Sequence, residues 1–183
     1  MSELSQAQVV QAVVAVERMS AAQRVQLADE IYLRQPNLLA SVLVLERMGV
    51  SLQQLEVPIY ILMVACQAIK ASALDWPLIT EDVQERCLQR LNGSIRFDEC
   101  LSPELMRQAA QQRVDDHAQR YLLAFVHGYL RDHDLLAVRS DAKKYLLLAS
   151  FNLVECIAAT APGGTLQRRP SSGKQTASRL RPF

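Results

Sequence analysis

The longest apolar stretch of the chain covers residues 57–69, in which Gln67 is the only side chain, apart from Pro58, that is neither apolar nor aromatic. Because proline suits the first position of a helix, this stretch predicts a helix that begins at Pro58 and is apolar on every side. Such a helix must be surrounded by other helices or by lipid. Its thirteen residues span roughly 20 Å, which is short for a hydrocarbon core of about 30 Å. The stretch therefore predicts a buried core helix rather than a membrane span.

A second stretch, residues 142–159, is apolar nearly all round and is followed by Pro162, which stops a helix. We expect this helix and the first one to lie innermost in the fold. The other helical patterns carry a single apolar stripe or are half polar, and we expect them to surround the two apolar helices. They cover residues 5–19, 20–35, 37–48, 80–92 and one long helix of about seven turns that starts at Ser102.

Local signals mark the ends of these helices. Ser20 and Gln23 have the spacing of a capping box, which opens a helix. Gly49 directly follows a helical pattern and is expected to end it, and Gly93 is expected to end another. Gly128 lies inside the long helix at a cost of about 1 kcal/mol relative to alanine, which suggests a kink or a close helix crossing there.

No window alternates apolar and polar residues clearly enough to predict a strand. Aromatic residues make up 5% of the chain, while alanine, leucine, valine and glutamine are plentiful, and this balance favours helix over sheet. A chain of 183 residues is long enough for one good-sized core and short for two full domains. We therefore predict an all-α fold, a single-domain helical bundle of about six to eight helices over residues 1–161.

Charge divides the chain into an acidic body and a basic tail. All 19 acidic residues lie at or before Glu155 with 15 of the 20 lysines and arginines, so the body has a net charge of −4 and the remainder +5. Residues 162–183 are rich in proline, glycine and serine, and we expect them to form a disordered tail. The tail suggests an alternative function, a nucleic-acid-associated accessory protein with polyanion contacts at Arg168, Arg169, Lys174, Arg179 and Arg181.

No catalytic, cofactor-binding or metal-binding motif stands out. His117, His127 and His133 are ten and six residues apart, which does not place them on one face of a helix. We therefore predict no metal and no cofactor. A second alternative function is an enzyme that leaves no local motif, with its site around Asp116, His117, His127 and Asp132.

The four cysteines are widely spaced without a C-x-x-C pair, which fits reduced thiols inside the cell better than a disulfide framework. Cys66 and Cys156 fall in the apolar helices and are expected to behave as small buried hydrophobic residues. Cys87 lies on an amphipathic helix. Cys100 precedes a helix start and is the thiol best placed to react, although the acidic residues beside it oppose a thiolate. We expect none of the four to be catalytic.

Two helices that are apolar all round need more cover than the other helices provide, which leaves apolar surface for a partner. A two-fold contact hides such a surface economically, because one patch then serves both copies. With no secretory signal at the N-terminus, we predict a non-catalytic cytoplasmic interaction protein, an adaptor or regulator that contacts other proteins and forms a homodimer. Neither a membrane nor a small-molecule ligand is predicted. The expected seam of the homodimer is Val9, Val13 and Val16.

Overall fold

The structure is a computed structural model that describes residues 3–98 and 102–162. Over these residues the chain forms eight α-helices and one 3-10 helix, and no strand is present among them. The predicted all-α fold of six to eight helices is therefore confirmed. The elements are α1 (Gln6–Glu17), α2 (Ala21–Arg34), α3 (Pro36–Leu43), η1 (Val44–Met48), α4 (Leu52–Ala71), α5 (Glu81–Asp98), α6 (Pro103–Asp116), α7 (Arg120–Asp132) and α8 (Asp141–Thr160).

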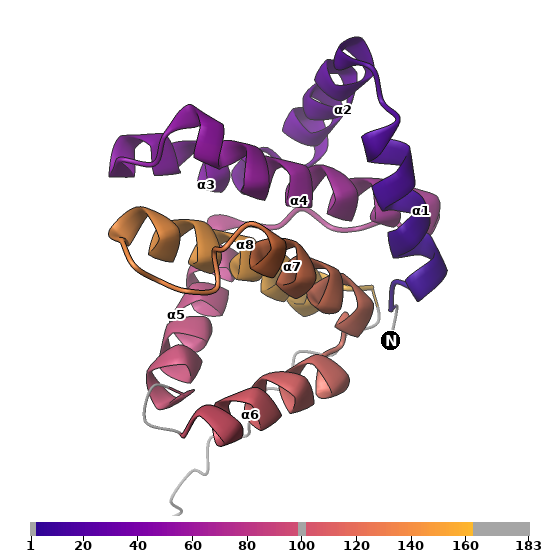
Figure 1. The fold of residues 1–183 in the computed structure, drawn as a ribbon. Coiled ribbons are helices and arrows are strands. Elements are labelled where there is room, and N and C mark those ends of the chain that lie inside the picture. The colour runs from indigo at the N-terminus through magenta and orange to yellow at the C-terminus, as the bar shows by residue number, and fades with distance from the viewer. Residues whose placement is uncertain (1–2, 99–101, 163–183) are drawn as a thin grey trace, which may run out of the picture.

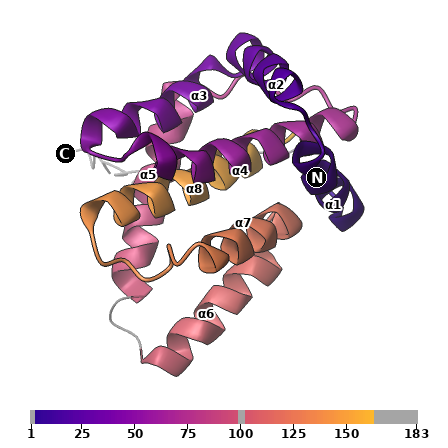
Figure 2. The same cartoon turned by 45° about the horizontal axis from the view of Figure 1, so that its top comes forward.

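Helices α4 and α8 contact each other at the centre of the molecule (Figure 1 and Figure 2). Helices α1 and α3 pack on α4, α5 packs along α8, and α7 contacts both α1 and α8. Eight side chains of α4 and seven of α8 are buried, so the prediction that these two helices lie innermost is confirmed. Helix α2 stands at one end of the molecule and α6 at the opposite end (Figure 1).

Helix α4 begins six residues before the predicted start, at Leu52, and Pro58 lies inside it. Ser51 and Gln54 form a capping box, in which the Ser51 amide donates to Gln54 Oε1 at 3.0 Å and the Gln54 amide donates to Ser51 Oγ at 3.3 Å. Proline has no amide hydrogen, so the carbonyl of Gln54 loses its helical donor. The cap and the burial of the following turns keep the helix continuous through Pro58.

The longer extent of α4 removes the length argument against a membrane span. At 20 residues it is the one helix in the described part of the chain that is long and apolar enough to cross a membrane. Its apolar character has another explanation in the fold, because Ile61, Leu62 and Val64 are buried against the surrounding helices.

The predicted long helix from Ser102 onward is wrong, because α6 ends at Asp116 and α7 begins at Arg120. The three residues between them are held by one bond to a distant part of the chain and one bond among themselves. The Leu4 amide donates to the buried Gln119 Oε1 at 3.0 Å, and the Gln119 amide donates to His117 Nδ1 at 3.0 Å. These bonds turn the chain and close the N-terminal segment onto the bundle.

The three glycines among the described residues differ from one another in the structure. Gly49 ends η1 with a positive φ of 89°, as predicted for a helix stop. Gly93 lies inside α5, which continues to Asp98, so the predicted end at Gly93 is wrong. Gly128 lies in α7, and a Cβ built there meets no atom within 4 Å, so the expected close helix crossing is absent at this position.

Candidate functional site

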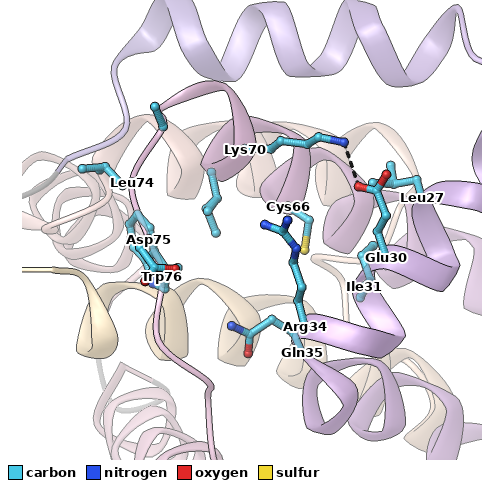
Figure 3. A pocket seen from close by; sticks show the side chains of 12 residues that line it. Leu27, Glu30, Ile31, Arg34, Gln35, Cys66, Lys70, Leu74, Asp75 and Trp76 are labelled. Atoms are coloured by element: carbon cyan, nitrogen blue, oxygen red, sulfur yellow. Dashed lines mark hydrogen bonds and ion pairs between the residues drawn. The ribbon is translucent and has the colours of Figure 1, made fainter.

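A groove of about 570 Å³ lies between α2, the C-terminal half of α4 and the segment that follows α4 (Figure 3). Its position follows from the fold, because α2 contacts α4 and α3 while most of its surface stays open. The residues that line it are Leu27, Glu30, Ile31, Arg34, Gln35, Cys66, Ile69, Lys70, Ala73, Leu74, Asp75 and Trp76.

Apolar side chains from three segments form the inner surface of the groove. Leu27 and Ile31 come from one face of α2, since residues four apart lie above each other on a helix. Ile69 comes from α4, and Leu74 and Trp76 come from the following segment. An apolar inner surface with polar side chains around it is typical of a binding groove.

Side-chain hydrogen bonds hold the wall opposite α2 in place. The Trp76 indole N–H is shared between the Ile157 carbonyl at 3.2 Å and Thr160 Oγ1 at 3.1 Å, both at the end of α8. At the end of α2, Gln35 Nε2 donates to the Pro77 carbonyl at 2.9 Å, and Gln35 Oε1 accepts the Ile79 amide at 2.9 Å. The groove is therefore shaped before any partner arrives.

Charged side chains surround the apolar surface. Lys70 Nζ lies 2.7 Å from Glu30 Oε2, so one ion pair joins α4 to α2 across the groove (Figure 3). The hydrogen bond from Lys70 lowers the pKa of the Glu30 carboxyl. Arg34 extends from α2 toward Cys66, and its charge also lowers the pKa of Glu30, but its guanidinium makes no hydrogen bond or ion pair among the described residues. An unpaired guanidinium beside an apolar surface suits a carboxylate ligand.

The one thiol in the groove is held in its unreactive form. Burial raises the pKa of Cys66 to about 12, because a thiolate is costly in an apolar environment. At neutral pH this thiol stays protonated, and it contributes apolar surface instead of a nucleophile. The groove therefore has the chemistry of a binding surface.

The outward side of α2 also carries large exposed apolar side chains, with the exposed Asp29 between Val25 and Leu33. Val25, Tyr32 and Leu33 are exposed by 62%, 64% and 79%, and their spacing of seven and eight residues places them along one side of the helix. We call Val25, Tyr32 and Leu33 the outer stripe of α2. Other helices of the same chain cover the inner side of α2, whereas its outer apolar side chains remain exposed to solvent.

The predicted homodimer seam does not lie on the surface. Val9 and Val16 are exposed by 3% and 0%, and Val13 is partly buried against the same core. Helix α1 packs along α4 through this stripe, so the chain itself covers it. The prediction failed because the stripe, although correctly recognised as apolar, meets a helix of its own chain.

The three histidines have separate surroundings. His117 Nε2 lies 3.6 Å from Glu155 Oε1 of α8, the His127 ring lies 6.4 Å from the Phe151 ring, and the His133 ring lies 4.2 Å from the Tyr129 ring. Across residues 3–98 and 102–162, no three His, Cys, Asp or Glu side chains come together as a group that could hold a metal ion.

Several predicted residues lie outside the described part of the chain. They are Cys100 and the polyanion contacts Arg168, Arg169, Lys174, Arg179 and Arg181. The nucleic-acid alternative, which depends on these arginines and this lysine, stays a prediction. No protein-family model, no curated protein and no solved structure matches this chain.

Proposed function

We propose that this protein is a non-catalytic cytoplasmic interaction protein that binds a segment of a partner protein in the groove between α2 and α4. The observation that supports this proposal is the apolar groove with the unpaired Arg34 guanidinium at its edge. Apolar side chains anchored in a preformed groove supply most of the affinity when a peptide segment binds a folded domain.

The surroundings of Arg34 specify the chemistry of the partner segment. Leu27, Ile31 and Ile69 suit two or three apolar side chains of the partner. Arg34 suits one aspartate or glutamate beside them, since a guanidinium pairs with a carboxylate through two parallel hydrogen bonds. We therefore infer an apolar segment that carries an acidic residue, and not a basic one.

A peptide display experiment on the full chain tests the proposal. Random twelve-residue peptides are selected on immobilised protein, and we expect enrichment of peptides with apolar residues at helical or alternating spacing next to an acidic residue. The variant Arg34→Glu should weaken the enriched peptides by about tenfold or more, which corresponds to about 1.4 kcal/mol.

The matched control is Arg47→Glu, which makes the same charge change at an exposed position of η1 outside the groove. It should leave peptide affinity within about twofold. If no sequence is enriched over an unrelated helical protein, or if both variants bind the peptides equally, the groove is not the binding site.

The outer stripe of α2 favours self-association as a second part of this function. Tyr32 and Leu33 are among the most exposed large apolar side chains in the described residues, and a two-fold contact would cover both copies at once. We therefore place the homodimer contact on the outer stripe, in place of the buried Val9, Val13 and Val16.

Light scattering over a range of protein concentrations tests this contact. At tens of micromolar we expect twice the chain mass of 20.5 kDa, with Leu33→Glu returning the mass of one chain. Leu105→Glu is the control, because Leu105 is exposed on α6 at the opposite end of the molecule. A single-chain mass for the unchanged protein, or a dimer that survives Leu33→Glu, would rule out the outer stripe.

A further inference from the structure

Two cysteines that are 69 positions apart in the sequence meet where α5 packs on α8. Cys87 of α5 and Cys156 of α8 are both free thiols, exposed by 1% and 0%. The two thiols interact, since the Cys156 side chain lowers the pKa of Cys87. Two interacting thiols on helices that pack together are candidates for a disulfide.

Arg90 lies one turn further along α5 and donates from Nη2 to Cys87 Sγ at 3.2 Å. The hydrogen bond from Cys156, with the bond and charge of Arg90, lowers the pKa of Cys87 to about 6, against the opposing effect of burial. The same interaction raises the pKa of Cys156. Of the two thiols, Cys87 is therefore the one that loses its proton more readily.

Cys87 also lines a cavity of about 470 Å³. Its other walls are Val83, Arg86, Gln89 and Arg90 of α5 and Ala159 and Thr160 of α8. Cys156 is not among the residues that line this cavity, although it interacts with Cys87. A small molecule that enters the cavity therefore reaches Cys87 before Cys156.

We propose that Cys87 and Cys156 form an oxidisable dithiol, in which Cys87 reduces a small hydroperoxide and Cys156 then closes a disulfide between α5 and α8. The Cys87 thiolate attacks one peroxide oxygen, the O–O bond breaks, and the leaving oxygen takes a proton from water. Cys87 becomes a sulfenic acid while the peroxide becomes an alcohol or water. Cys156 then loses its proton, attacks the Cys87 sulfur and displaces the sulfenic oxygen as water. Two thiols are thus oxidised by two electrons, and one peroxide is reduced by two.

Oxidation of the full chain by hydrogen peroxide under native conditions tests the proposal. The experiment uses a Cys100→Ser background, so that this further thiol cannot compete. We expect the intact mass to fall by two hydrogen atoms, and peptide mapping to find a disulfide between Cys87 and Cys156. The variant Cys156→Ala should stop at one added oxygen on Cys87, which a sulfenic-acid reagent such as dimedone captures.

Controls separate this site from general thiol oxidation. Cys66→Ala removes a half-buried thiol of α4 and should leave disulfide formation unchanged. Arg90→Met should slow the loss of the Cys87 thiol by about tenfold, whereas Arg86→Met, in the same cavity without a bond to sulfur, should change it by less than about twofold. Arg90→Lys should restore part of the rate.

Three results would overturn the proposal. They are an absence of any disulfide between Cys87 and Cys156, a disulfide that instead contains Cys66, and equal oxidation of Cys87 and Cys66 by the same peroxide. If the folded Cys156→Ala variant collects no sulfenic acid on Cys87, the order of the two steps is also wrong. Circular dichroism of each variant establishes that the helices are intact before oxidation.

Discussion

Gly49 and Gly128 differ in backbone conformation, and the difference decides what an alanine would do at each position. Gly49 has φ +89°, and alanine there should cost about 1–2 kcal/mol because its Cβ crowds the carbonyl oxygen in the left-handed region. Gly128 lies within α7 with open space where a Cβ would be, so alanine should add about 0.5–1 kcal/mol by restricting the unfolded chain. Urea unfolding of Gly49→Ala and Gly128→Ala measures both. Equal midpoints for the two variants would contradict this reading of the backbone.

Helix caps could be predicted from the sequence where the capping bonds join residues only three or four positions apart. The capping box of Ser20 and Gln23 is present, with the Ser20 amide donating to Gln23 Oε1 at 2.8 Å. The capping box of Ser51 and Gln54 has the same spacing in the sequence. The start of α4 was nevertheless predicted at Pro58, because proline suits the first position of a helix. A proline is tolerated in the seventh position of α4 because buried side chains on both sides of it hold the helix together.

Among the helices, α4 has the most buried side chains, and its middle is buried while its start is exposed. Leu62 is fully buried, so Leu62→Ala should lower the free energy of unfolding by about 2–5 kcal/mol, through lost burial and a cavity. Leu52, at the start of the same helix, is exposed, and Leu52→Ala should change stability by less than about 0.5 kcal/mol. Chemical denaturation of both variants checks the difference. A small effect of Leu62→Ala would mean that the packing around α4 is not as described.

Element types followed from the sequence, but the contacts that end or cover elements did not. The break between α6 and α7 depends on the bond from the Leu4 amide to Gln119, which are 115 positions apart. The groove depends on how α2 and α4 meet, as in the ion pair of Glu30 with Lys70 across 40 positions. The sequence placed Cys87 and Cys156 on two different helices but could not predict that the two helices bring them together. Arg90, one turn after Cys87, was the local feature that favours a thiolate there.

At the scale of the whole molecule, two titrating groups make the fold sensitive to acid. The hydrogen bond from His117 lowers the pKa of Glu155 below its ordinary 4.5, so this carboxylate stabilises the fold at neutral pH and that stability is lost as the pH falls through its folded value. Burial lowers the pKa of His127 below 6.5, so the unfolded chain takes up this proton more readily and stability falls as the pH drops below about 6.5. Both effects have the same sign.

Thermal unfolding between pH 7 and pH 4 measures this sensitivity. We expect the melting temperature to decrease steadily toward acid, and Glu155→Gln to reduce the part of the decrease that occurs near and below pH 4.5. Glu46→Gln, at an exposed carboxyl of η1 outside the outer stripe and the groove, is the control and should follow the unchanged protein. A melting temperature that stays constant or rises toward pH 4 would contradict the assignment.

The chain has a single tryptophan, Trp76, and its setting gives the molecule a built-in optical reporter. The indole ring lies in the wall of the groove, and its N–H is held by the last turn of α8. Its emission therefore reports the polarity of that wall, free of any other indole. A peptide that seats beside Leu74 and Trp76 would shift or quench this emission in the unlabelled protein, and a separation of α8 from the segment after α4 would move it toward the red.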